Sequence, residues 1–153
     1  MSEAKLWGDI QSGMVARWHA QRHEDKHSTG IPDVSFGIGR RSEGWVELKY
    51  LPEMPNLSSN KPWDFKYDHF TSDQRNWLEL RLRHGTGRLF LLCRFGDDLT
   101  ALWNWERMRL RLGVQPLRDI INAANAQWWH GVDFGELENV LTNNRVIPPR
   151  FKI

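Results

Sequence analysis

The segment from Gly30 to Tyr50 shows a clear alternation of apolar and polar residues. Apolar residues occupy every second position on either side of the polar run GRRSEG, and they are Val34, Phe36 and Ile38, then Val46, Leu48 and Tyr50. A period of two is typical of half-buried β-strands, and a polar run containing Gly is typical of a turn. The pattern predicts a β-hairpin in which Glu47 and Lys49 project together from the face opposite the apolar residues.

The segment TSDQRNWLELRLRHG predicts a helix. Thr71 or Ser72 is a suitable N-cap, apolar residues follow at helical spacing, and Gly85 stops the pattern. The residues before it, LPEMPNLSSNKPWDFKYDHF, contain three Pro and little periodicity. They predict a long loop, and loops of that length in compact domains are often lids or binding loops.

The N-terminal residues have a weaker pattern. The segment from Glu3 to Met14 predicts a short helix, although Gly8 and Gly13 interrupt it. The run VARWHAQRHE nearly alternates between apolar and polar residues, which favours a half-exposed strand, with a helix as the alternative.

The second half of the chain predicts more strands and then helices. The runs RLFLLCRFG and LTALWNW flank a turn-like Gly96-Asp97-Asp98 and predict a strand pair, giving a sheet of about five strands. PLRDIINAANAQWW and VDFGELENVLTN then predict helices, the second with Asp133 and Glu136 at capping-box spacing. We therefore expect one α/β domain over residues 1–153, a central mixed β-sheet flanked by helices, with 114–153 as a helical C-terminal extension.

Composition narrows the class of protein. The 153 residues fit one domain, no apolar run approaches the length of about 20 residues that spans a bilayer, and the N-terminus lacks the pattern of a signal peptide. The single Cys93 lies in an apolar run, predicts a buried residue, and cannot form an intrachain disulfide. We expect a cytoplasmic protein with no membrane contact.

Charge and aromatic content add two limits. The formal net charge of +2 is too small for general polyanion binding, so any nucleic-acid affinity must be local. The chain has nine Trp, four of them in NAQWWHG and TALWNWERM. A packed aromatic core or a dimer face explains these four better than base stacking does.

Two acidic residues of the hairpin indicate chemistry. Asp33 starts one strand and Glu47 lies in the other, so their carboxylates can converge where a divalent cation would relieve their repulsion. Hard oxygen ligands with room for water suit Mg²⁺ or Mn²⁺, and no organic cofactor is needed. Lys49 would orient or deprotonate the attacking water, or stabilise charge on phosphorus. These are the parts of a phosphodiester hydrolase.

The spacing of these residues resembles a known signature. Pro32-Asp33, thirteen intervening residues and then Glu47-Leu48-Lys49 resemble the PD-(D/E)XK nuclease signature, most closely its VRR-NUC and Holliday-junction-resolvase-like branch. That branch carries a Gln on the following helix, and Gln74 occupies the matching place. The resemblance covers Gly30 to Gly85, about a third of the chain.

The resemblance implies a restriction-endonuclease-like core and specific roles. Asp33, Glu47 and the backbone carbonyl of Leu48 would bind the metal, Lys49 would be the catalytic lysine, and Gln74 would position water or substrate.

The family adds an acidic residue on its first helix. Of the acidic residues that the chain offers, Glu3, Asp9 and Glu24, the second lies in the right element and the third lies nearer the motif. Asp9 and Glu24 are therefore the candidates, and a one-metal mechanism is expected if neither reaches the metal.

Substrate contacts would come from basic residues near the motif. The candidates are Arg22, His23, Arg40, Arg41, Lys61, Lys66 and Arg75. No segment resembles a base-reading helix, so recognition of shape or backbone is expected.

The resemblance implies a structure-selective DNA endonuclease for branched or Holliday-junction DNA, acting as a homodimer because two symmetric strands are cut. A phage or mobile element would be a fitting source. The alternatives are a catalytically silent DNA-binding or virion-associated module, an RNA-processing nuclease, or a structural hairpin with a surface salt bridge between Glu47 and Lys49.

Overall fold

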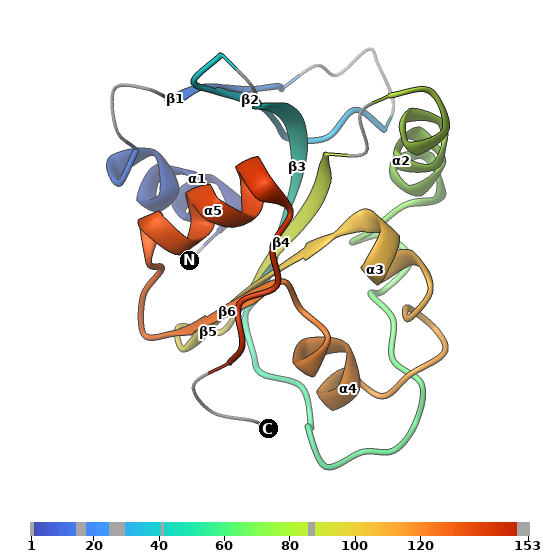
Figure 1. Cartoon of the computed structure of the whole chain (residues 1–153). Coiled ribbons are helices and arrows are strands. Elements are labelled where there is room, and N and C mark those ends of the chain that lie inside the picture. The colour runs from blue at the N-terminus through green and yellow to red at the C-terminus, as the bar shows by residue number, and fades with distance from the viewer. Residues whose placement is uncertain (1, 15–17, 25–29, 41, 86–87, 150–153) are drawn as a thin grey trace.

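The computed structural model describes residues 2–14, 18–24, 30–40, 42–85 and 88–149. A six-stranded sheet forms the middle layer, and helices cover both of its faces (Figure 1). The elements in chain order are α1 (Glu3–Ser12), β1 (Trp18–Arg22), β2 (Val34–Ile38), β3 (Ser42–Leu51), α2 (Ser72–His84), β4 (Leu89–Phe95), β5 (Leu99–Asn104), α3 (Trp105–Arg109), α4 (Leu117–Asn122), β6 (Ala126–Trp129) and α5 (Phe134–Asn143). The expected fold class, a mixed sheet flanked by helices, is confirmed.

The strands lie in the sheet in the order in which they occur along the chain. Neighbouring strands are antiparallel except β3 and β4, which are parallel. The connection between β3 and β4 runs through the long loop of residues 52–71 and α2. The sheet is therefore two antiparallel three-stranded units, β1–β3 and β4–β6, joined by one parallel pair.

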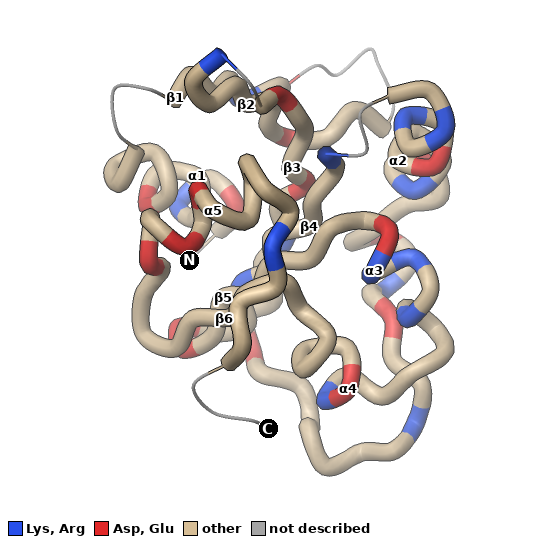
Figure 2. Tube along the Cα trace, viewed as in Figure 1, with Lys and Arg blue, Asp and Glu red and all other residues tan. Residues whose placement is uncertain are grey.

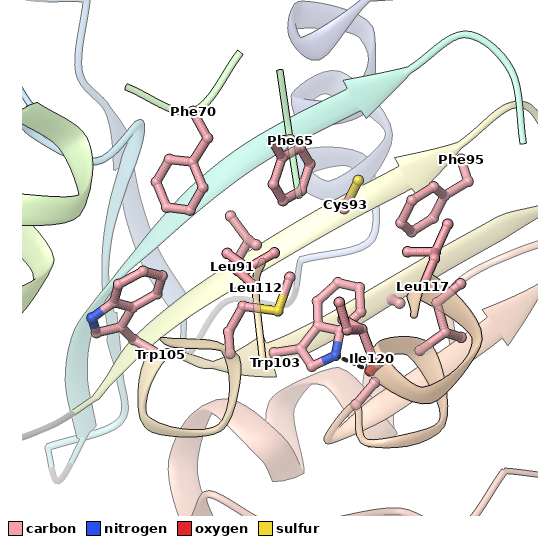
Figure 3. Close-up of a cluster of buried hydrophobic side chains, with 14 of the residues drawn as sticks. Phe65, Phe70, Leu91, Cys93, Phe95, Trp103, Trp105, Leu112, Leu117 and Ile120 are labelled. Carbon is pink, nitrogen blue, oxygen red and sulfur yellow. Dashed lines mark hydrogen bonds between the residues drawn. The ribbon is translucent and has the colours of Figure 1, made fainter. Parts of the chain in front are cut away.

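Each face of the sheet has its own hydrophobic core. One face packs against α1 and α5, through residues such as Leu6 and Val140. The other packs against the long loop, α2, α3 and α4, and Figure 3 shows the centre of this cluster, where the indole of Trp103 donates a 2.7 Å hydrogen bond to the carbonyl of Ile120. Cys93 lies within this second core with no exposed surface, as predicted. The second core is the one beneath Glu47 and Lys49.

The predicted hairpin and the predicted helix over residues 72–84 are both present. β3 begins at Ser42, so Ser42 to Gly44 belong to a strand and the turn is shorter than the run GRRSEG suggested. Gly44 has no room for a side chain, because a Cβ there would lie 2.3 Å from the carbonyl oxygen of Arg88. Close approach of neighbouring chain, and not a turn, explains this glycine.

The prediction for the C-terminal third was wrong in part. The segment PLRDIINAANAQWW is not one helix: α4 ends at Asn122, and β6 follows as a sixth strand paired with β5. Residues 114–149 therefore complete the sheet and are not a purely helical extension.

The Trp residues of the second half are mostly core residues. Trp103, Trp105 and Trp128 are 0%, 3% and 6% exposed, and only Trp129 of the four is half-buried. These indoles fill the cores and do not form an exposed dimer face. Within the described ranges no helix is long and apolar enough to cross a bilayer.

Candidate active site

The site begins where the pairing of β2 with β3 stops. The last paired residues are Val34 and Val46, and Asp33 lies directly before Val34. Oδ2 of Asp33 accepts a 2.8 Å hydrogen bond from the backbone N–H of Leu48. Because the N–H and C=O of one strand residue point to the same edge, the carbonyl of Leu48 faces the side of Asp33 as well.

Glu47 is the most buried acidic group of this region. Its side chain is 1% exposed, and Oε1 lies 2.8 Å from Nζ of Lys49 and accepts a 2.7 Å hydrogen bond from Nε2 of Gln74. Oε2 is buried and has no hydrogen-bond partner among the described residues. Burial raises the pKa of Glu47 to about 8, although the Lys49 ammonium acts to lower it; the Asp33 carboxylate adds to the rise.

Lys49 and Gln74 hold Glu47 in place. Nζ of Lys49 donates to Oε1 of Gln74 at 3.4 Å and lies 5.5 Å from the ring centroid of Phe70. Only 4% of the Lys49 side chain is exposed. Its ion pair with Glu47 is therefore not the surface salt bridge expected of a purely structural hairpin. The pair is a buried one, and charges are rarely buried without a role that repays their desolvation.

Gln74 belongs both to the site and to the start of α2. Thr71 is the N-cap: its Oγ1 accepts from the N–H of Gln74 at 3.3 Å, and its own N–H donates to Oε1 of Gln74 at 3.0 Å. This capping box fixes the rotamer of Gln74. The side-chain amide therefore meets Glu47 in a single orientation.

Gly30 places the Asp33 segment against α2. Its φ is +87°, and a Cβ at this position would lie 2.3 Å from the carbonyl oxygen of Asp73. Only glycine combines this backbone conformation with so close an approach. The contact brings the two halves of the site, Asp33 and Gln74, together.

Of the three acidic residues considered for the first helix, Glu3 is the one whose pKa is affected by the site, although it was not one of the two preferred candidates. Burial raises the pKa of Glu3, and the charges of Lys49 and Asp33 act on it, the first lowering and the second raising the value. Glu3 is thus within electrostatic range of the site.

The two preferred candidates, Asp9 and Glu24, are each close to an arginine. Oδ2 of Asp9 lies 2.8 Å from Nη1 of Arg94, and Glu24 is largely exposed, with Oε1 3.6 Å from Arg22. Helical periodicity could have indicated Glu3. This residue precedes the buried Leu6 by three positions and so shares the face of α1 that packs on the sheet.

The predicted substrate-binding residues divide into two groups. His23 lies at the site: its backbone N–H donates to the carbonyl of Asp33 at 2.7 Å, and its ring Nε2 is 2.7 Å from Oγ of Ser35. Arg22 precedes it on β1 and acts on the pKa of Glu3.

Other basic residues lie elsewhere or are engaged. Arg40 is exposed at the opposite end of β2 from Asp33, and Lys61 and Lys66 are exposed on the long loop. Arg75 forms a bidentate pair with Asp64 at 2.8 and 3.0 Å, which ties the loop to α2. Arg41 lies outside the described residues.

The donor set can accept a hard divalent cation. Among the described residues no three His, Cys, Asp or Glu side chains converge as a complete ligand set. Two carboxylates, one with an unpartnered buried oxygen, and the Leu48 carbonyl lie together. This set fits a cation such as Mg²⁺ that keeps several waters and takes only one or two carboxylates from the protein.

Comparisons with known proteins give distant similarities to solved structures. No protein-family model matches the chain, and no curated protein matches it. Among solved structures, the chain is similar to Archaeoglobus fulgidus Hjc, a Holliday junction resolvase from an archaeal hyperthermophile, with 16% identity, a TM-score of 0.43, and coverage of 69% of this chain and 74% of that chain. A similarity this distant does not assign an activity.

Proposed function

We propose that this protein is a divalent-metal-dependent DNA endonuclease that hydrolyses phosphodiester bonds. The observation that carries the proposal is the buried Glu47, held by Lys49 and Gln74 through one oxygen while its other oxygen has no protein partner. A structural ion pair would be expected to satisfy both oxygens. An unsatisfied buried carboxylate oxygen beside Asp33 is the arrangement expected of a cation ligand.

Each residue has a role in this proposal. Asp33, Glu47 and the Leu48 carbonyl would hold Mg²⁺ or Mn²⁺, which when bound lowers the pKa of a coordinated water and offsets charge on the phosphate. Lys49 orients or deprotonates the attacking water, or stabilises the charge that develops on phosphorus. Gln74 holds the Glu47 carboxylate and the Lys49 ammonium at fixed positions, because both contact its side-chain amide.

The proposed substrate is branched DNA, including four-way junctions. The sequence resemblance to the junction-resolvase-like branch supports this choice, and no segment of the sequence resembles a base-reading helix, which favours recognition of shape over base sequence. Cutting two symmetric strands of a junction requires two copies of the site, so the proposed active form is a homodimer.

The first prediction tests the site and the substrate in one experiment. Labelled four-way junction, flap, linear duplex and single-stranded DNA are incubated with Mg²⁺, Mn²⁺ or EDTA. The wild type is expected to cut the branched substrates only with metal. Lys49→Ala and Lys49→Met are expected to lose cleavage by a factor of at least about 10², and Lys49→Met retains an unbranched side chain of similar length without the charge.

Lys5→Ala is the matched control, since Lys5 is an exposed lysine of α1. It should cut at the wild-type rate. Normal cutting by a folded Lys49→Met would remove Lys49 from the mechanism. Binding without cutting under any metal would favour the silent DNA-binding module, and cutting of RNA duplexes alone would favour the RNA-processing nuclease.

A further inference from the structure

A set of aromatic rings in mutual contact, tilted by 37° in one pair and edge-to-face at 66° in the other, lies next to the candidate active site. We call it the aromatic ladder, and it consists of His23, Trp45, Trp77 and the guanidinium of Arg81. The ring centroids of His23 and Trp45 are 5.2 Å apart, those of Trp45 and Trp77 are 5.0 Å apart, and Cζ of Arg81 lies 4.8 Å from the centroid of Trp77 and 5.8 Å from that of Trp45.

Two elements of the active site carry the ladder outward. Trp45 precedes Glu47 by two residues on β3, so both project from the same face, separated by about 7 Å along the strand. Trp77 and Arg81 follow Gln74 by three and seven residues on α2, so they lie on the helix face that meets Glu47. The ladder therefore extends from the site along the contact between β3 and α2.

The ladder differs from the aromatic core on the same face of the sheet. Trp103 and Trp105 are 0% and 3% exposed, whereas Trp45, Trp77 and His23 are half-buried and Arg81 is exposed. Full burial would suit packing alone. Rings at the rim of a core, beneath an exposed guanidinium, can receive a further planar group.

Charge near the ladder favours an anionic occupant. The last turn of α2 carries Arg81, Arg83 and His84, and Figure 2 shows Lys and Arg along this helix. Arg22 lies at the end of β1, one residue before His23. Glu43 and Glu47 are the acidic groups on the Trp45 face of β3, the first exposed and the second buried. Aromatic rings bordered by cations are the combination that binds single-stranded nucleic acid.

We infer that the aromatic ladder binds an unpaired nucleotide of the DNA strand that is cut, next to the scissile phosphate. The inference rests on the proposed function and adds a substrate requirement to it. A base in a continuous duplex is stacked on both sides and has no free face to offer, whereas a base at a branch, flap or single-stranded gap has one. The exposed Arg81 would contact the base or the neighbouring phosphate as the base stacks on the indoles.

Binding without cleavage tests the inference independently of catalysis. The full chain is titrated in EDTA with a short fluorescein-labelled oligothymidylate and with a blunt duplex of the same length, and anisotropy and Trp fluorescence are followed. We expect tighter binding of the oligothymidylate and quenching of Trp fluorescence. Trp45→Leu should weaken oligothymidylate binding about five- to a hundredfold, with Trp45→Phe between that variant and wild type.

Arg81→Ala and Arg83→Ala form a matched pair that does not disturb the core. Both remove one exposed positive charge from the same helix turn, but only Arg81 lies over the rings. Arg81→Ala should weaken oligothymidylate binding about fivefold or more, and Arg83→Ala by no more than about twofold.

Equal losses for the two Arg variants, or equal effects of Trp45→Leu on duplex and single strand, would overturn the inference. If the protein nevertheless shows metal-dependent cleavage, the proposed nuclease activity stands and only the proposed role of the aromatic ladder fails. If the variants show that the ladder binds the oligothymidylate but the protein cuts no substrate, nucleotide binding by the ladder stands and the proposed nuclease activity fails.

Discussion

In the metal-free protein, two effects act on the ionisation of Glu47 in opposite directions. Burial disfavours its charged form, while Lys49 at 2.8 Å favours it, and the first effect is the larger. Residues that serve a site in this way commonly lower the stability of the fold that holds them. The opposition makes the stability of the protein depend on pH.

The second prediction concerns this pH dependence. The unfolded chain releases the Glu47 proton near the ordinary value of 4.5, whereas the folded protein holds it up to about 8. Below 4.5 both states are protonated, so the full stability is present there; between these values the folded state binds more protons, and the free energy of unfolding falls as pH rises. Denaturant titrations in EDTA should show a decrease of a few kcal/mol across this interval.

Glu47→Gln is the control for that slope. The substitution keeps the shape of the side chain and removes the titrating group, so the decrease should become much shallower. An unchanged slope in the variant would assign the pH dependence to other residues.

Single residues of the site were predictable to different degrees. Period-two alternation was enough to place Glu47 beside Lys49, and the capped helix was enough to bring Gln74 into consideration. Choosing among Glu3, Asp9 and Glu24 required knowledge of which side of α1 faces the sheet. Asp9 is engaged by Arg94, a residue 85 positions away, and no local pattern contains that partner.

At the scale of elements, the start of α2 contributes both to the stability of the helix and to the geometry of the site. The third prediction concerns two substitutions that affect these contributions differently. Thr71→Ala removes the hydroxyl that caps Gln74 but leaves the Gln74 contact with Glu47, so it should destabilise the protein by about 1 kcal/mol with cleavage retained. Gln74→Ala should have a similar effect on stability and a strong effect on cleavage. Parallel denaturation and cleavage assays check this, and equal cleavage by both variants would leave Gln74 with a capping role alone.

The fourth prediction concerns the contact of the Asp33 segment with α2. Gly30 and Gly39 both have positive φ, but a Cβ meets the Asp73 carbonyl at Gly30 and open space at Gly39. Gly39→Ala should therefore cost only the backbone conformation, about 1–2 kcal/mol, and leave cleavage unchanged. Gly30→Ala should cost at least twice as much and reduce cleavage, and equal effects in thermal melts would contradict the close packing.

The element that the sequence did not predict is β6. Ala, Asn and Gln before its Trp pair are compatible with a helix, so the local pattern extends α4. The strand is decided by distant partners: the side chain of Asn125 accepts from the N–H of Asn104 at 2.8 Å and donates to the carbonyl of Arg145 at 3.0 Å. Such contacts override local preference and are not visible in the pattern of neighbouring residues.

At the scale of the whole molecule, the fifth prediction is the assembly. A homodimer is expected in light scattering, at least with junction DNA present, because two cuts need two sites. The Trp residues of the C-terminal half lie in the cores, so the interface must use other residues. A monomer under both conditions would contradict the homodimer and favour a nuclease that cuts one strand at a time.

The division of the sheet also governs the order of folding. Each antiparallel unit forms from strands that are close in sequence, but β3 can pair with β4 only after residues 52–88 have closed into a loop, and closure costs entropy before the new contacts compensate it. Glu47 and Lys49 lie on β3, whereas Gln74 lies within that loop. The contacts among Glu47, Lys49 and Gln74 are therefore expected to form last, so that a partly folded chain has strands and a hydrophobic surface but lacks the proposed catalytic site.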